Sequence, residues 1–174
     1  MTGIDQWLSD QLDVSAPATL DDLQGIVTDL GHAPWLWSEA VRFDLPRRSC
    51  SVLYRAPAFR IALFGWAAAQ ETTYHDHGGA EGAVFVCSGL LIEDVLDVRD
   101  GKAVREHTFT RCAESAFSFG AAHVHRVRHE PALGVSLSIH AYTPAVTAVS
   151  DYDVLEDGTL RRIDVEEARS EQAA

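Results

Sequence analysis

Residues 72–79 of the chain read Thr-Thr-Tyr-His-Asp-His-Gly-Gly, a β-rich stretch that ends in two glycines. Because side chains alternate between the two faces of a β-strand, His75 and His77 present their imidazoles on one face. A further histidine, His125, follows fifty residues later. If a neighbouring strand carries it, the three rings can bind one metal ion from one side and leave coordination positions open. Alone, so short a motif favours two solvated histidines near a loop, and the surrounding residues reverse that preference.

The composition indicates one globular domain. The chain has 174 residues, 47% hydrophobic and 23% charged, which is enough to bury a substantial core. A formal net charge of −12 argues against nucleic acid or an anionic membrane as a partner. No signal peptide and no apolar run long enough to span a bilayer are visible, so we expect a cytoplasmic protein. Cys50, Cys87 and Cys112 lack CxxC spacing, which predicts reduced, buried thiols.

The N-terminal part of the chain has helical periodicity. Apolar residues between positions 4 and 12 share one helix face. The run from Thr19 to Asp22 resembles a capping box with Asp in place of Glu, and Gly31 supplies a stop signal. We therefore expect a helical segment over residues 1–45.

From residue 50 the sequence changes to short β-rich runs punctuated by Gly, Asp and Pro. These runs predict strands near 51–55, 60–67, 71–77, 83–88, 90–98, 103–109, 115–119, 123–129, 133–142 and 159–165. Asp100-Gly101 is a strong hairpin signal. Short strands without long helices between them exclude a βαβ sheet and favour an antiparallel sandwich or barrel. We expect a single domain over 1–174, with a β-barrel over 50–165 and a tail over 166–174.

The spacing around the histidines resembles the first motif of the cupin superfamily. His75, His77 and Gly89 match the motif, and Gly82 stands where a typical cupin has its Glu ligand. Glu81 is one residue out of register, and a slip of one residue turns a side chain to the opposite strand face. The resemblance implies a mainly β fold, the cupin double-stranded β-helix or jelly-roll barrel, with the N-terminal helices packed outside. A site of three histidines is favoured over one that includes Glu81.

Residues 125–144 resemble the cysteine dioxygenase family. In that family a Ser, a His and a Tyr follow the third histidine ligand at +13, +15 and +17. Counted from His125, these offsets fall on Ser138, His140 and Tyr142. The resemblance covers residues 50–155 and implies that His75, His77 and His125 bind Fe(II), although imidazoles also suit zinc, nickel or copper. His123, which fits the general second cupin motif, is then expected at the rim of the site or beside a ligand.

The Ser-His-Tyr residues also have a physical interpretation of their own. Ser138, His140 and Tyr142 alternate along an apolar strand and share one face, while the apolar residues between them take the other. Buried polar groups need partners, which predicts a hydrogen-bonded row from Ser138 through His140 to Tyr142. The alternative is a solvent-facing polar stripe on an antiparallel strand.

The family also holds the substrate carboxylate with an Arg on an early strand. The resemblance assigns this role to Arg55, with Arg60 as the rival, because an Arg fork grips a carboxylate in a bidentate manner. A surface salt bridge is the alternative for either residue. Mammalian members have a Cys at the position of Gly82 that is crosslinked to the Tyr. Gly82 excludes that link, so Tyr142 is expected to be a free phenol, as in a bacterial form.

The resemblance thus implies a mononuclear non-haem Fe(II) thiol dioxygenase of cysteine catabolism that converts L-cysteine and O2 to cysteine sulfinic acid. Tyr142 is expected to orient the substrate, and His140 to hold Tyr142. Three alternatives stay open: a dioxygenase for 3-mercaptopropionate or another small thiol, a cupin dioxygenase or isomerase that uses Glu81, and a non-catalytic metal-binding cupin. The expected partners are a small thiol and O2, and the expected state is a monomer or weak homo-oligomer.

Overall fold

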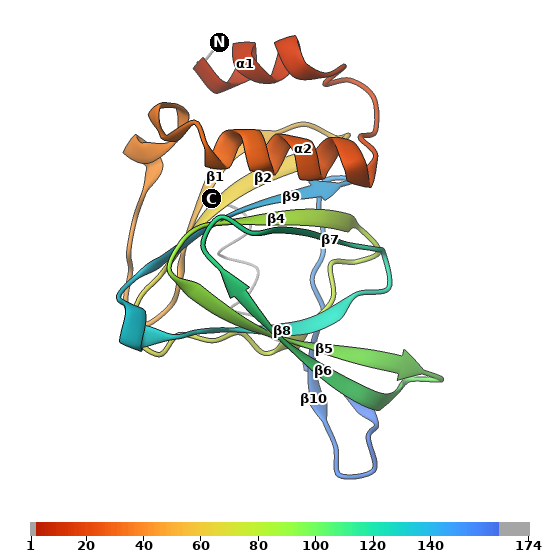
Figure 1. Cartoon of the computed structure of the whole chain (residues 1–174). Helices are drawn as coiled ribbons and strands as arrows, with labels where there is room; N and C mark the ends of the chain where they lie inside the picture. Colours follow the sequence, from red (N-terminus) through yellow and green to blue (C-terminus); the bar gives the residue numbers. More distant parts are fainter. Residues whose placement is uncertain (1–2, 164–174) are drawn as a thin grey trace.

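The computed structural model describes residues 3–163, and Figure 1 shows how their helices and strands are arranged. Two α-helices come first and the strands follow. The helices are α1 (Gly3–Gln11) and α2 (Leu20–Gly31), and the 3-10 turns are Pro34–Leu36, Ser38–Ala40 and Pro131–Leu133. The strands are β1 (Ser49–Arg55), β2 (Arg60–Trp66), β3 (Tyr74–His75), β4 (Glu81–Ser88), β5 (Leu90–Arg99), β6 (Lys102–Cys112), β7 (Ala116–Phe119), β8 (Val124–His129), β9 (Ser136–Thr143), β10 (Asp151–Val154) and β11 (Leu160–Ile163).

The strands form two antiparallel sheets that face each other (Figure 1). One sheet has the order β1-β2-β9-β4-β7, and the other has the order β11-β10-β3-β8-β5-β6. Strands distant in sequence are neighbours in both sheets, as β2 and β9 are, which is the connectivity of a jelly roll rather than of a simple meander. The predicted mainly β architecture is confirmed.

The helices cover the outer face of the first sheet (Figure 1), as expected. α2 begins with the predicted capping box: the Thr19 hydroxyl accepts the backbone N–H of Asp22, and the Asp22 carboxylate accepts the backbone N–H of Thr19 at 2.9 Å. Such reciprocal bonds satisfy two backbone donors that a helix leaves unpaired. The apolar face of α2 packs in one cluster with Phe85 of β4 and Ile139 of β9.

β9 separates two cores because its side chains alternate. Ile139 and Ala141 belong to the cluster under the helices. Ser138, His140 and Tyr142 are buried on the opposite face, toward the second sheet. The predicted division of this strand into an apolar and a polar face is therefore present, and both faces are covered.

One predicted strand is shorter in the structure, and one strand of the structure was not predicted. Of residues 71–77 only Tyr74–His75 form a regular strand, because the backbone on either side makes single bonds to separate loops and strands. β10 was not predicted, because a run of four residues that includes two Asp is a weak strand signal; pairing with β3 and β11 stabilises it. The end of the strand predicted at 159–165 and the tail predicted at 166–174 lie outside the described residues.

Smaller features follow from local chemistry. Asp100 and Gly101 both have positive φ, 50° and 74°, the conformation that a two-residue hairpin turn requires. The thiols are free, but Cys112 is exposed on the edge strand β6, so its predicted burial is wrong. Cys50 and Cys87 are half-buried.

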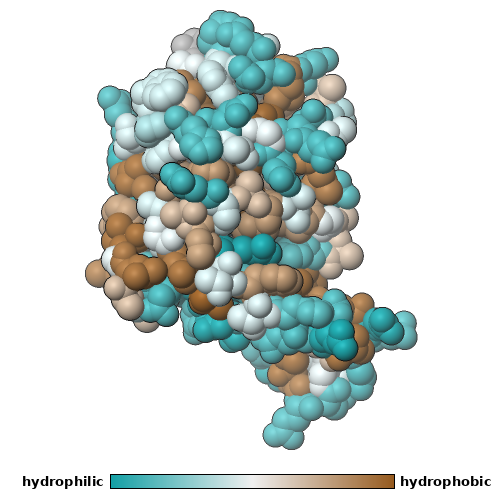
Figure 2. Space-filling model, in the orientation of Figure 1, coloured by the Kyte–Doolittle hydropathy of each residue, from teal (hydrophilic) through white to brown (hydrophobic). Residues whose placement is uncertain are grey.

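The outer surface is mixed in character. On the face shown in Figure 2, hydrophilic residues predominate over the helical layer and the projecting hairpins, and hydrophobic residues gather between them. Within residues 3–163 no helix combines the length and apolar character needed to cross a membrane.

Candidate metal centre

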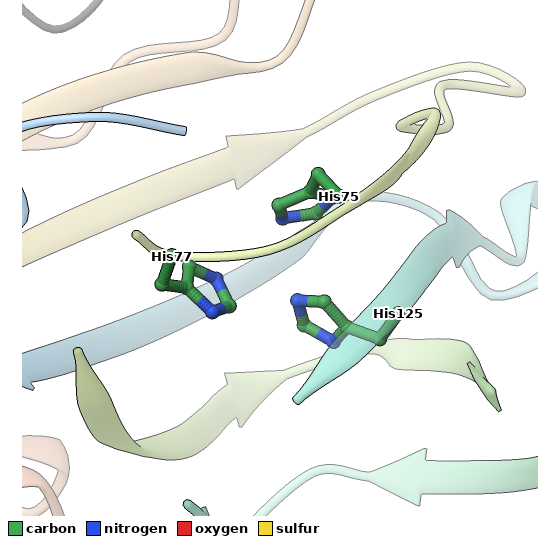
Figure 3. A group of neighbouring side chains, drawn as sticks. All are labelled: His75, His77 and His125. Atoms are coloured by element: carbon green, nitrogen blue, oxygen red, sulfur yellow. The ribbon is translucent and has the colours of Figure 1, made fainter. Parts of the chain in front are cut away.

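Two neighbouring strands bring three histidines together. His75 of β3 lies directly opposite His125 of β8, and His77 follows His75 on the same side. Figure 3 shows the three rings converging on one point. One nitrogen of each ring lies within 4.8 Å of the others, and all three side chains are buried. This is the facial arrangement that the spacing predicts.

Hydrogen bonds orient two of these rings. Nδ1 of His75 lies 3.0 Å from the carbonyl oxygen of Thr73, and Nδ1 of His125 lies 2.8 Å from Oε1 of Glu93. Because both oxygens only accept, each Nδ1 carries the proton and Nε2 keeps a free lone pair. Nδ1 of His77 is buried without a hydrogen-bond partner among residues 3–163. Rings held in this way are typical of metal ligands.

Burial keeps the three imidazoles neutral. It is the main reason that the pKa values of His75, His77 and His125 lie below the ordinary value, and the neighbouring imidazoles lower them further. Protons and metal ions compete for the same nitrogen, so a neutral ring is the form that binds metal. Both the geometry and the donor set therefore fit a single divalent transition-metal ion.

A buried carboxylate from β5, Glu93, supports the site, and sequence reasoning missed it. Oε1 of Glu93 accepts from His125 at 2.8 Å and from His123 at 3.0 Å. Oε2 accepts from Nε and Nη2 of Arg111 at 2.8 and 2.6 Å. Burial alone would raise the pKa of Glu93, but hydrogen bonds from His123 and His125 and the charge of Arg111 hold it well below the ordinary value. The only sequence signal is the acidic pair Glu93-Asp94, which interrupts the apolar run at the start of the strand.

The other candidate ligands lie elsewhere. His123 contacts Glu93 and belongs to a second possible donor group with Glu93 and His125, not to the group of three histidines. No possible donor group among residues 3–163 contains Glu81. Gly82 pairs directly with Tyr142, and a Cβ at this position would lie 2.4 Å from the Phe119 ring. Any larger residue at position 82 would therefore have to displace Phe119.

Ser138, His140 and Tyr142 form the predicted row, and Trp66 of β2 extends it. The Trp66 indole N–H donates to Ser138 Oγ at 3.1 Å. Ser138 Oγ lies 2.9 Å from Nε2 of His140, and Nδ1 of His140 lies 3.1 Å from the Tyr142 hydroxyl. An indole only donates, so the consistent direction runs from Trp66 through Ser138 and His140. The Tyr142 oxygen then accepts, which leaves its own proton available to a ligand.

The row is neutral. Burial first, and then the charge of Arg48, lowers the pKa of His140 to about 3. Burial also raises the pKa of Tyr142 above the ordinary value. His140 is therefore uncharged and Tyr142 protonated at neutral pH. The ring centroids of Tyr142 and His77 are 5.1 Å apart, so the phenol lies beside the histidine cluster.

A cavity of about 290 Å³ joins these groups, and His75, His77 and Tyr142 line it. Arg60 of β2 lines it too, is only 5% exposed, and lies opposite Tyr142 in the β2–β9 pairing. Arg55, the residue expected to hold the substrate, is exposed at the end of β1 and is not part of the lining. The rival arginine is thus the one that the fold brings to the cavity.

The fold and the three histidines define a cupin with a candidate metal centre. The family model for cysteine dioxygenase type I matches residues 10–154, and the chain belongs to this family. The resemblance inferred from residues 125–144 is thereby confirmed, and membership supports an oxidoreductase of the thiol dioxygenase class. Among curated proteins, none matches the chain.

Solved structures agree on the fold. TT1209 from Thermus thermophilus is 16% identical with a TM-score of 0.52, over 62% of this chain and 93% of that one. A protein with a double-stranded β-helix domain from Klebsiella pneumoniae subsp. pneumoniae is also 16% identical with a TM-score of 0.52, over 67% and 93%. An oxalate oxidase is 13% identical with a TM-score of 0.53, over 63% and 57%. Likeness at these identities concerns the fold alone, and it confirms the double-stranded β-helix.

Proposed function

We propose that the protein is a mononuclear non-haem iron dioxygenase that adds both atoms of O2 to the sulfur of a small thiol, converting L-cysteine to cysteine sulfinic acid. Family membership supports this reaction class. The observation that carries the proposal is the Tyr142 phenol, which lines the same cavity as His75 and His77. A thiol and O2 together contain the atoms of the sulfinic acid, so the reaction needs no external reductant.

Three histidines would hold the metal. His75, His77 and His125 provide imidazole donors that suit several transition metals, and the choice of Fe(II) rests on the family. When bound, the metal supplies the position at which thiolate and dioxygen meet. The chain keeps the rings neutral by burial and orients two of them through Thr73 and Glu93. A preorganised site of this kind binds metal without rearranging its ligands.

Arg60 is our proposal for the residue that holds the substrate carboxylate, in place of Arg55. It lines the cavity beside Tyr142, and a planar guanidinium can donate two parallel hydrogen bonds to one carboxylate. A carboxylate fixed in this way would leave the thiol end of a small substrate directed toward the histidines.

Tyr142 would donate its proton in a hydrogen bond to the bound substrate. The row from Trp66 to His140 fixes the phenol oxygen and leaves the proton available. Because Tyr142 and the histidines beside it are buried, such a bond acts with little competition from water. Ser138 and His140 act through Tyr142 and position it.

Thiol turnover by iron-reconstituted protein tests the proposal. The purified chain is loaded with one equivalent of Fe(II) without oxygen and then mixed with O2 and cysteine, 3-mercaptopropionate, mercaptosuccinate or cysteamine. Oxygen uptake and product mass are followed together. We expect one O2 consumed for each sulfinate formed with at least one thiol. Stoichiometric iron binding without oxidation of any thiol would overturn the proposal in favour of a non-catalytic metal-binding cupin.

A further inference from the structure

Several arginines of this protein differ in whether they have a carboxylate partner. Four arginines of the second sheet pair with carboxylates: Arg111 with Glu93, Arg126 and Arg128 with Asp94, and Arg161 with Asp153. Two arginines of the cavity, Arg48 and Arg60, form no ion pair with any carboxylate within residues 3–163. In a chain of net charge −12, two cations without carboxylate partners in one cavity mark an anion-binding site.

Arg60 is the more buried of the two. Its Nε has no hydrogen-bond partner in the described part of the chain, and its Nη2 lies 3.9 Å from the sulfur of Cys50. Leaving a buried guanidinium nitrogen without an acceptor costs folding free energy. An anionic ligand that accepts from Arg60 Nε would remove that cost.

Arg48 is held in place by aromatic rings. Its guanidinium carbon lies 4.9 Å from the centroid of Phe64 and 5.2 Å from that of Trp66. Stacking on aromatic faces restricts a guanidinium without using its N–H donors, which stay free for a ligand. The charge of Arg48 lowers the pKa of His75 and His140, in agreement with its position beside the histidine cluster.

The two guanidinium groups reach the same part of the cavity wall. Arg60 comes from the end of β2 that pairs with Tyr142, and its Nη2 approaches Cys50, which lies directly opposite Phe64 in the β1–β2 pairing. Arg48 lies over Phe64 and Trp66. Two cations that share one cavity without carboxylate partners among the described residues match a ligand with two negative charges better than a ligand with one.

We infer that Arg48 and Arg60 select a thiol that carries two carboxylates, with Arg60 holding one and Arg48 the other. The inference rests on the proposed function and narrows its substrate class. A cavity of about 290 Å³ suits so small a ligand, since it lies at the low end of ligand-binding pockets. Cysteine brings only one carboxylate, which Arg60 alone would hold, so the inference predicts that a dicarboxylate thiol binds more tightly.

The test compares two thiols that differ by one carboxylate, mercaptosuccinate and 3-mercaptopropionate. With the iron-loaded protein we expect kcat/KM to be at least about tenfold higher for mercaptosuccinate than for 3-mercaptopropionate. About tenfold is the lower end of what one charge-assisted bidentate contact contributes. Arg48→Met keeps an unbranched apolar side chain beside the rings and removes the charge. It should abolish that preference, because kcat/KM for mercaptosuccinate falls by more than kcat/KM for 3-mercaptopropionate. Arg105→Met, which removes an equal charge from an exposed position on β6 outside the cavity, is the matched control.

Equilibrium binding separates this inference from the reaction itself. Zn(II) is redox-inactive and accepts the same ligands, so the zinc-loaded protein reports affinity without turnover. Calorimetric titration of the zinc-loaded protein should give a dissociation constant for mercaptosuccinate at least about tenfold lower than that for 3-mercaptopropionate. In Arg48→Met the two dissociation constants should be similar. If Arg48→Met does not fold, Arg48→Lys keeps the charge without the planar fork and should lose part of the preference.

The possible outcomes lead to different conclusions. Equal or weaker binding of the dicarboxylate by wild-type protein overturns the inference and leaves a monocarboxylate thiol as the substrate. An equal loss for both thiols in Arg48→Met also overturns it, because the residue would then serve only folding. If no thiol is oxidised but the zinc-loaded protein prefers the dicarboxylate, the anion site stands and the dioxygenase proposal fails.

Discussion

Oε1 of Glu93 lies 2.8 Å from Nδ1 of His125, while Oε2 of the same carboxylate is held by Arg111. The carboxylate thereby fixes the tautomer of the ring, because Nδ1 must donate and Nε2 is left for a metal. A histidine ligand oriented by a buried carboxylate is also a stronger base. The strand β5 therefore takes part in the metal centre although it contributes no ligand of the three-histidine group.

Replacing Glu93 by Gln should weaken metal binding. The substitution keeps the size of the side chain but removes the negative charge that two histidines and an arginine contact. A group that orients a metal ligand by a hydrogen bond typically contributes about 10–100-fold to metal affinity. Competition against a chromophoric chelator measures the dissociation constant without reference to catalysis. Glu114→Gln, at an exposed position between β6 and β7, serves as the control. Unchanged affinity in folded Glu93→Gln protein would show that the carboxylate only stabilises the sheets.

The third ligand can be distinguished from its neighbour His123. We expect His125→Ala to lose stoichiometric iron binding, because one of three donors is removed, and His123→Ala to keep it. Iron content after gel filtration decides between them, and circular dichroism checks that both variants fold. Full iron occupancy in His125→Ala together with loss in His123→Ala would move the metal to the second donor group, Glu93, His123 and His125.

Asp94 should make stability depend on pH in acid. Burial alone would raise the pKa of Asp94, but hydrogen bonds from Arg128, Thr108 and Arg126 outweigh it and hold the pKa below its ordinary value of 3.8. A lowered folded-state pKa stabilises the fold above the unfolded value, and that contribution is lost as the pH falls through the folded value. Asp94→Asn should therefore be less stable than the wild type at pH 6, by roughly 1–3 kcal/mol. Urea unfolding from pH 6 downward should show the difference shrinking below pH 3.8; a constant difference would rule out titration of Asp94 as its cause.

Whether the sequence predicts a feature of this protein depends on how far apart in the chain the interacting residues lie. The same-face pair His75 and His77 and the capping box at Thr19 are local, and strand alternation or helix geometry is sufficient to predict them. Glu93 could not be predicted, because its contact with His125 depends on the register between β5 and β8. A register between strands distant in sequence leaves no trace in the periodicity of either one.

The two candidate arginines illustrate the same limit. Arg55 and Arg60 lie directly opposite each other at the end of the β1–β2 hairpin, so the sequence pattern alone ranks neither above the other. Only the packing of the two sheets separates them, since it buries Arg60 in the cavity and leaves Arg55 exposed.

This difference makes Arg55 a matched control for Arg60. Arg60→Met should lower kcat/KM for cysteine by about tenfold to more than a hundredfold, the value of a charge-assisted bidentate contact. Cysteamine, which has no carboxylate, should be affected much less, and Arg55→Met should leave both thiols unchanged. A selective loss for cysteine in Arg55→Met instead would restore the assignment made from the sequence.

Tyr142→Phe removes only a hydroxyl and should slow the reaction without disturbing the centre. We expect the variant to fold and to bind iron as the wild type does, because Tyr142 is not one of the three histidine donors. One hydrogen bond directed at the reacting groups is typically worth about 10²-fold in rate. Single-turnover formation of the sulfinate, followed by mass spectrometry, measures the effect separately from product release.

His140→Ala should have a smaller effect of the same kind, because it leaves the phenol in place without the Nδ1–H donor that fixes its oxygen. The double variant should lose less than the sum of the two single effects in free energy, since His140 acts through Tyr142. Fully additive losses would mean that His140 acts on the substrate independently. Wild-type rates in Tyr142→Phe would reduce the row from Trp66 to Tyr142 to a way of satisfying buried polar groups, and the three histidines alone would then support an enzymatic role.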